Sequence, residues 1–542
     1  MALPFARTID LNGRAPETLY NGITLASPWP PRQRFPDEHL VTPPYLADPP
    51  AVIPIDVGRQ LFVDDFLIEE TTMWRTHHRA AYHPSSPVLK PETPWEREDE
   101  YSDRTNRKKN PSAMPFSDGV FFDPADRQFK MWYMAGYLMH TCLALSNDGI
   151  AWRRPPLAVF PNNPPSSNIV MPSGRDSGTV WLDLETRDLS ERYKMALFHE
   201  RSLSLHASAD GLHWRPIGET GLAGDRTTFF YNPFRKVWVF GVRGNLDVNR
   251  GRYRRYWENA DFNRADNWGG VDPVAWVRSD AKDFARPGLA TEAELYNLDC
   301  VGYESLMLGL FNVWRGEDPT REKINEITVG FSRDGFHWTR PSRQTFIGVS
   351  DTPGSWNFAN VQSAGGCCLI VGDRLHFYVS GRQGVPGTDD PGVCSTGLAM
   401  LRRDGFASMD WLPDEAPVLR RGARERGGTL VTRPLRFSGG HCFVNADTAG
   451  GELRVAVLDQ QGRAIPAFAS ERCTPVRGDG TKLAVTWPGT ELSTLAGQAV
   501  RFRFTLSKGR LYAFWVSRWP TGESSGYAAA GGPEFSGPAD TK

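Results

Sequence analysis

Three features that would place the chain in a common class are missing. No apolar run reaches the roughly 18 residues that a membrane-spanning helix needs, and residues 1–20 contain neither a basic segment nor a continuous apolar stretch. The 7 cysteines are odd in number and show no C-x-x-C spacing, which predicts neither a disulfide framework nor a zinc site. Lys and Arg number 62 against 63 Asp and Glu, so no basic excess is available for nucleic acid. We therefore expect a cytoplasmic protein with no nucleic-acid, membrane, cofactor or metal partner.

A short phrase, Ser-x-Asp-Gly-x-x-Trp, occurs at 146–152, 208–214 and 332–338, and weaker forms surround Asp280 and Asp404. Asp-Gly supplies the positive φ that a tight turn requires, and the Trp is expected to pack between neighbouring units. Several short strand patterns precede each phrase, and helical periodicity is scarce. Five such units predict an all-β fold with a five-bladed β-propeller over about residues 56–422.

The segments that flank the predicted propeller differ from it in composition. Residues 1–55 are rich in Pro and lack periodicity, which predicts an extended N-terminal arm. Residues 423–525 contain alternating strand patterns separated by Gly, Asp and Thr, as in a C-terminal β-sandwich. The small and polar residues of 526–542 predict a disordered tail.

Acidic residues recur at the predicted start of the innermost strand of each blade. Because these strands line the central axis of a propeller, their starting residues converge although they are far apart in sequence. The five candidates are Asp118, Asp176, Asp225, Glu304 and Gln362, four of them acids. Cleavage of a glycosidic bond needs one carboxylic acid to protonate the leaving oxygen and a second carboxylate as nucleophile or base.

Of these acids, Glu304 is the best candidate because it directly precedes the apolar run LMLGLF, where a structural strand would rarely place a charge. Structural alternatives are a turn cap for Asp118 and an ion pair between Asp225 and Arg226. Neighbouring polar and aromatic side chains are candidates for binding substrate hydroxyls: Arg175, Asp176, Arg226, Arg255, Tyr256 and Gln362. Arg255 and Tyr256 could equally belong to an exposed loop.

The repeated phrase and the acids in blade order resemble the furanosidase propeller superfamily of glycoside hydrolase families 32, 43 and 68. The layout of a five-bladed propeller followed by a β-sandwich is similar to family 32. By blade order the resemblance implies Asp118 as nucleophile or base, Asp225 as transition-state stabiliser and Glu304 as acid/base. The chain lacks the family sequences WMNDPNG, Arg-Asp-Pro and Glu-Cys-Pro, so it would be a divergent member.

The resemblance implies hydrolysis of a fructofuranosyl or arabinofuranosyl linkage in an oligosaccharide, with retention of configuration expected. Whether Asp118 or Asp176 partners Glu304 is left open, as is homo-oligomer formation. One alternative is a propeller that binds carbohydrate or protein without turnover, which crowded acids argue against. Another is a glycosyl-transferring or phosphorolytic relative, which would need Arg and Lys near the hub.

Overall fold

A computed structural model describes residues 17–32, 42–97, 110–172, 174–245, 251–290, 292–317, 321, 323–388, 390–412, 427–448 and 450–542. Within these ranges the chain is nearly all β, which confirms the all-β part of the prediction. The α-helices in this part of the chain are single turns, α1 (Pro44–Ala47) and α2 (Pro94–Arg97). Short 3-10 helices span Leu189–Glu191, Phe262–Ala265, Asn267–Gly270, Pro466–Phe468, Ser470–Arg472 and Leu492–Leu495. A search of the described residues finds no helix long and apolar enough to cross a membrane.

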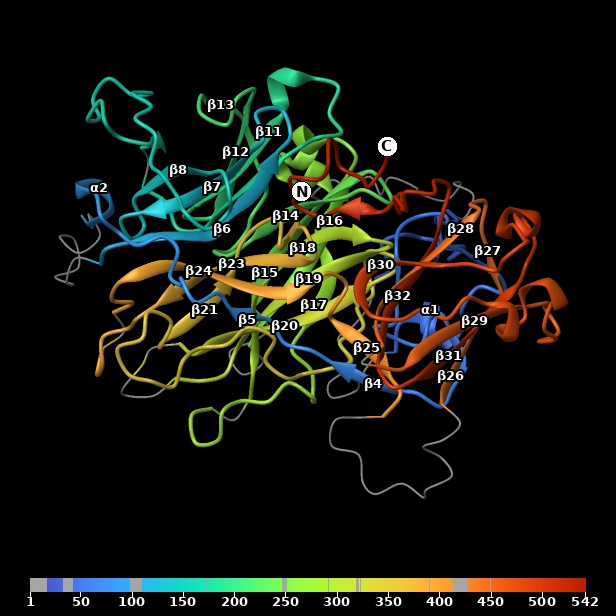
Figure 1. Ribbon diagram of the computed structural model, residues 1–542. Coiled ribbons are helices and arrows are strands. Elements are labelled where there is room, and N and C mark those ends of the chain that lie inside the picture. The colour runs from blue at the N-terminus through green and yellow to red at the C-terminus, as the bar shows by residue number, and fades with distance from the viewer. Residues whose placement is uncertain are drawn as a thin grey trace.

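Five antiparallel sheets, numbered here in chain order, follow one another along the chain (Figure 1). Sheet 1 contains β6 (Ala113–Asp123), β7 (Gln128–Ala135), β8 (His140–Ser146) and β9 (Ile169–Met171). Sheet 2 contains β10 (Gly178–Leu182), β11 (Tyr193–His199), β12 (Ser202–Ser208) and β13 (Arg215–Glu219). Sheet 3 contains β14 (Thr228–Asn232), β15 (Val237–Asn245), β16 (Arg252–Asn259) and β17 (Val274–Arg278). Sheet 4 contains β18 (Glu294–Glu304), β19 (Leu306–Trp314), β20 (Asn325–Ser332) and the distant β33 (Tyr527–Ala528). Sheet 5 contains β21 (Asn360–Ser363), β22 (Leu369–Val371), β23 (Arg374–Arg382), β24 (Cys394–Arg402) and the early β5 (Ala81–Tyr82).

Strands of neighbouring sheets contact one another in turn. Strand β6 contacts β10, β10 contacts β14, β14 contacts β18, and β20 contacts β21. Strand β21 in turn contacts β6, so sheets 5 and 1 are neighbours although they are far apart in sequence. Most of the buried apolar side chains of all five sheets belong to one continuous core.

The repeated Ser-x-Asp-Gly phrases form the turns that the sequence predicts. In the first, the Ser146 hydroxyl accepts a hydrogen bond from the amide of Gly149, and Asp148 accepts one from the amide of Ile150 at 2.8 Å. Gly149 has a φ of 74°, a conformation that glycine adopts without penalty. The turns at Ser208 and Ser332 make the same bonds.

Each of these turns also accepts a hydrogen bond from the neighbouring sheet that comes before it in the series of contacts. These bonds link the sheets to one another. Trp132 of sheet 1 donates to the Gly211 carbonyl in the turn of sheet 2, at 2.9 Å. Trp276 of sheet 3 donates to the Phe336 carbonyl in the turn of sheet 4, at 2.7 Å. Tyr378 of sheet 5 donates to the Gly149 carbonyl of sheet 1. This last bond connects the end of the series to its beginning.

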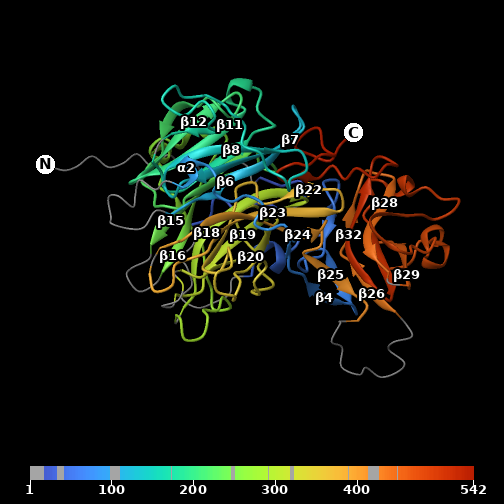
Figure 2. The ribbon, with the colours of Figure 1, turned by 60° about the vertical axis from the view of Figure 1, so that its left-hand side comes forward.

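Two further sheets enclose a second core (Figure 2). Sheet 6 contains β30 (Asp479–Val485), β28 (His441–Asp447), β32 (Arg510–Ser517), β25 (Ala407–Asp410), β4 (Trp74–His77) and β2 (Gln60–Leu61). Sheet 7 contains β29 (Glu452–Leu458), β31 (Arg501–Ser507), β26 (Gly428–Thr432) and β3 (Ile68–Thr71). A short parallel pair joins β1 (Ile53–Pro54) to β27 (Leu435–Arg436).

The boundary predicted at residue 56 is corrected by strands β2, β3 and β4. They lie in sheets 6 and 7 rather than in the repeated sheets, because β32, β26 and β25 offer them unpaired edges. The first residue of the chain that joins the repeated sheets is in β5, which pairs with β24. The boundary predicted at 422 lies outside the described residues.

Residues 526–542, expected to be disordered, are ordered in this structure. Strand β33 pairs with the end of β18, and Ala528, Ala530 and Phe535 are buried. Small residues allow this close packing: a side chain at Gly532 would meet the Ile370 carbonyl oxygen. The low apolar content of residues 526–542 suggested disorder. Composition does not reveal that another part of the chain covers this segment.

Phe535→Ala is therefore expected to lower the free energy of unfolding by about 3 kcal/mol, the usual cost of emptying a buried aromatic position. Chemical denaturation measures the change. The control is Leu189→Ala, whose side chain is 70% exposed and should cost almost nothing. Equal stability of the two variants would mean that the tail does not pack as described.

Candidate functional site

Asp118 lies in β6 where this strand departs from its pairing with β7. The register shifts just before Gly119, and the backbone of Phe116 and Ser117 has φ values of 39° and 67°. Residues other than glycine adopt such conformations at a cost. A side chain at Gly119 would meet the Val180 carbonyl oxygen at 2.5 Å, so glycine is required there. Backbone strain of this kind concentrates at functional sites.

Asp118 forms a buried ion pair with Arg175. The Arg175 Nη1 lies 2.7 Å from Oδ1 of Asp118, and both side chains are fully buried. Gly178 leaves room for the pair, because a Cβ there would lie 2.7 Å from the same Oδ1. Burial raises the pKa of Asp118 to about 6, although the charges of Arg175 and Arg226 act in the opposite direction. Oδ2 of Asp118 has no hydrogen-bond partner among the described residues. This carboxyl therefore combines a pKa near 6 with one buried oxygen that has no hydrogen bond among the described residues.

A second buried carboxylate, Asp299 in the middle of β18, supports the backbone next to Asp118. Its Oδ2 accepts hydrogen bonds from Ser117 Oγ at 3.1 Å, from Asn297 Nδ2 at 3.0 Å and from the Ser363 hydroxyl. Burial raises the pKa of Asp299, while these hydrogen bonds act to lower it. The network joins sheets 1, 4 and 5 and fixes the position of Ser117.

Two arginines complete the buried cluster. Arg226, just before β14, donates from Nη1 to the Phe116 carbonyl at 3.1 Å and from Nη2 to Ser117 Oγ at 3.0 Å. Arg254, in β16, donates from Nη1 to the Arg226 carbonyl at 3.2 Å. Burial lowers the pKa of both guanidinium groups. Arginine nevertheless stays protonated in proteins.

Three other predicted site residues have different environments. Asp176 is partly buried beside Arg175, and its Oδ1 has no hydrogen-bond partner among the described residues. Gln362 is fully buried in β21, and neither end of its amide has a partner there. Asp225 is 32% exposed and forms an ion pair with Arg243. The first two can belong to the cluster, whereas Asp225 lies at its more exposed edge.

Glu304 does not join this cluster, which corrects the prediction. It is the last residue of β18, five positions beyond Asp299, or roughly 16 Å along an extended strand. Its carboxylate accepts hydrogen bonds from Arg403 at 2.9 Å, from the Arg59 amide at 3.1 Å and from Ser524 Oγ at 2.6 Å. These contacts make Glu304 a structural group between sheet 4 and the segments around 59, 403 and 524.

The error came from the assignment of the first strand of sheet 4. The apolar run LMLGLF is β19, the second strand, and the first strand is ELYNLDCVGYE before it. Counting four strands in each unit would have revealed the missing one and with it Asn297 and Asp299, the polar residues within an otherwise apolar strand.

Arg255 and Tyr256 are also outside the cluster. Tyr256 packs against Trp276 and Phe336 in the core, with ring centroids 5.1 and 5.0 Å away. Arg255 is partly exposed and contacts the Leu222 carbonyl at 3.5 Å. Because side chains alternate along a strand, the neighbouring Arg254 faces the cluster instead. Within this strand the buried cluster therefore contains Arg254 and neither of the two predicted residues.

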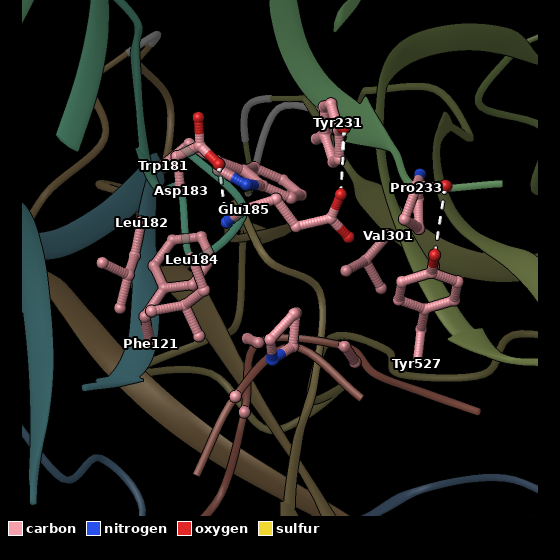
Figure 3. A pocket seen from close by; sticks show the side chains of 16 residues that line it. Phe121, Trp181, Leu182, Asp183, Leu184, Glu185, Tyr231, Pro233, Val301 and Tyr527 are labelled. Atoms are coloured by element: carbon pink, nitrogen blue, oxygen red, sulfur yellow. Dashed lines mark hydrogen bonds between the residues drawn. The ribbon is translucent and has the colours of Figure 1, made fainter. Parts of the chain in front are cut away.

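A small pocket lies near the other ends of the first strands (Figure 3). Its lining includes Trp181, Glu185, Tyr231 and Val301, and Tyr527 of the C-terminal segment closes it. The Tyr231 hydroxyl donates to Glu185 at 3.1 Å. The volume of about 50 Å³ accommodates a few water molecules but no sugar ring.

A search of the described residues finds no group of three or more His, Cys, Asp or Glu side chains that could hold a metal ion.

No protein-family model matches the chain, and no curated protein matches it. Solved structures that resemble it include a thermostable family-43 glycoside hydrolase, 10% identical, with 56% of this chain and 95% of that chain covered and a TM-score of 0.37. A fructofuranosidase from Schwanniomyces occidentalis complexed with fructose is 11% identical over 81% of this chain and 97% of that chain, with a TM-score of 0.35. An N-acetylgalactosamine deacetylase from F. plautii is 13% identical over 65% and 97%, with a TM-score of 0.36. TM-scores this low carry no functional argument, so the function proposed next rests on the residues of this chain.

Proposed function

We propose that the protein is a glycoside hydrolase that uses the carboxylates of the cluster around Asp118. The observation that carries this proposal is the carboxyl of Asp118, buried beside Arg175, with a pKa raised to about 6. A carboxyl with such a pKa is partly protonated near neutral pH and can protonate the oxygen of a leaving sugar. This assigns Asp118 the role of general acid in place of Glu304.

Asp176 is the proposed second carboxylate, acting as nucleophile or base. It follows Arg175 directly in the chain, it is partly exposed, and its Oδ1 has no partner among the described residues. Asp299 is unsuitable for this role because three hydrogen bonds hold its Oδ2 in place. Asp225, paired with Arg243, would contribute charge at the edge of the site rather than proton transfer.

The fold proposed with this function is a five-bladed β-propeller, with sheets 1 to 5 as blades and sheets 6 and 7 as a β-sandwich. Two observations support the proposal. Contacts run from β6 through β10 and β14 to β18 of sheet 4, continue from β20 of the same sheet to β21, and return from β21 to β6. In addition, Tyr378 bonds the turn of sheet 1. In a propeller the first strands surround a central axis, where the cluster would then lie. The proposed substrate is a fructofuranosyl or arabinofuranosyl oligosaccharide, as the resemblance of the repeated turns implies, and cleavage is proposed to retain configuration.

The test is a screen of the purified protein on aryl arabinofuranosides, aryl fructofuranosides and the corresponding oligosaccharides. We expect release of the aryl group from at least one furanoside, with NMR of the first product showing the same anomeric configuration as the substrate. Inversion would overturn retention alone. Binding of oligosaccharides without turnover of any substrate would contradict the enzymatic proposal and support a binding propeller.

A further inference from the structure

The two arginines of the cluster form no direct ion pair with a carboxylate of the described residues, although the charge of Asp299 acts on both. Among the largest fully buried side chains of the protein are four arginines: Arg59, Arg226, Arg254 and Arg315. Arg59 lies 2.9 Å from a carboxylate oxygen of Asp404, and Arg315 lies 3.6 Å from one of Glu326. For Arg226 and Arg254, no carboxylate of the described residues lies within ion-pair distance.

Burying two such guanidinium groups without a bound ligand lowers the stability of the folded protein. Removing a guanidinium group from water without a compensating anion costs several kcal/mol, so buried arginines are ordinarily paired. Like charges increase the cost here, since Arg243 and Arg252 repel Arg254 electrostatically. The charge of Asp299 offsets part of this cost, but three hydrogen bonds hold its Oδ2 and it makes no direct ion pair with either arginine, while Asp118 pairs with Arg175.

The unused donors of Arg254 form a particular geometric pattern. Its Nη1 is occupied by the Arg226 carbonyl, whereas Nε and Nη2 have no partner among the described residues. These two nitrogens form one edge of the planar guanidinium group, and their N–H bonds are parallel. This edge binds the two oxygens of a carboxylate or phosphate with two hydrogen bonds at once. The Nε of Arg226 is a third donor without a partner.

From this geometry we propose that Arg226 and Arg254 form an oxyanion subsite next to Asp118. Its ligand is the carboxylate of a uronic acid unit in the substrate, and the same chemistry would also accept inorganic phosphate. The substrate would then be an acidic oligosaccharide, which the subsite positions relative to the Asp118 carboxyl. This assignment of the substrate class rests on the proposed function. The binding step itself requires no turnover.

The test is calorimetric titration of the full-length protein with glucuronate, galacturonate, inorganic phosphate and glucose as the neutral control. We expect at least one uronate to bind about ten- to hundredfold more tightly than glucose, as hydrogen bonds to a charged group allow. Arg254→Gln should remove this difference, and Arg254→Lys should remove most of it, because lysine keeps the charge but has no planar edge. The matched control is Arg264→Gln, which alters a side chain that is 74% exposed.

The outcomes separate the possible ligands and the two proposals. A preference for uronate that depends on Arg254 supports an acidic substrate, and a preference for phosphate alone that depends on Arg254 supports the subsite with phosphate as its ligand. Equal binding of uronate, phosphate and glucose by the wild-type protein overturns the proposal, even if the Arg254 variants do not fold. Undiminished uronate binding in folded Arg254→Gln also overturns it. Uronate binding in a protein that hydrolyses nothing would support the subsite and contradict only the glycosidase proposal.

Discussion

Asp118→Asn is expected to lower kcat/KM on an unactivated glycoside by about 10²- to 10⁴-fold, the usual contribution of a general acid. Asparagine has nearly the same shape but cannot protonate the leaving oxygen. The matched control is Asp126→Asn, in the turn that follows β6, where the carboxylate is 48% exposed and should be dispensable. Steady-state kinetics on the substrate found by the furanoside screen measure both variants.

A change of leaving group distinguishes loss of the acid from general damage to the site. An aryl glycoside with a strongly acidic phenol needs little protonation, so Asp118→Asn should retain a larger share of its activity on that substrate. Equal loss on both substrates would assign Asp118 another role, such as nucleophile.

The wild-type pH profile provides a second check on the same residue. The general acid must be protonated to act, and burial raises the pKa of Asp118 to about 6. We therefore expect kcat/KM to fall as the pH rises through about 6. A rise of activity through this range would mean that the ionised form of Asp118 is the active one.

Glu304→Gln is expected to reduce stability strongly, by about 3–5 kcal/mol, because it removes one partner of a buried ion-pair network. Arg59, whose side chain is 2% exposed, lies 3.4 Å from Glu304, and Arg403 lies 2.9 Å away. Glutamine would leave both guanidinium groups with a weaker, uncharged partner in a buried site. Urea denaturation measures the loss.

Catalysis by the folded fraction of Glu304→Gln should be unchanged, since Glu304 lies far along β18 from Asp299. The control for stability is Glu69→Gln, which alters a carboxylate that is 43% exposed and paired at 3.4 Å, and which should cost less than about 1 kcal/mol. A stable but inactive Glu304→Gln would restore the role that the sequence suggested for this residue.

The turns and the site differ in how far the sequence could predict them. The turns around Asp148, Asp210 and Asp334 were predictable because Ser, Asp and Gly determine their conformation through local hydrogen bonds. Asp118 was a candidate because it precedes the apolar strand pattern GVFF, and its site role stays a prediction. For Glu304, the prediction took β19, the second strand of sheet 4, for the first. It therefore selected Glu304 at the end of the true first strand, β18, instead of Asp299 in the middle of that strand.

Other parts of the structure depend on contacts between distant residues. The order of the C-terminal segment depends on β33 pairing with β18, and β2 to β4 depend on edges formed some 330 to 450 residues later. Composition does not reveal such partners. The polar appearance of residues 526–542 therefore suggested disorder where the structure has buried side chains.

The sequence by itself determined the all-β class, the repeated turns around Asp148, Asp210 and Asp334, and the presence of acids near the first strands. These features follow from local rules, namely the two-residue period of strands and the turn preference of Asp-Gly. Only the tertiary structure decided which polar groups meet: Asp118 with Arg175, Asp299 with Ser117, and Arg254 with the Arg226 carbonyl. The physical reason is that burial and electrostatic interaction depend on distance in space, so residues from several sheets must come together before the pKa of a buried carboxyl is raised.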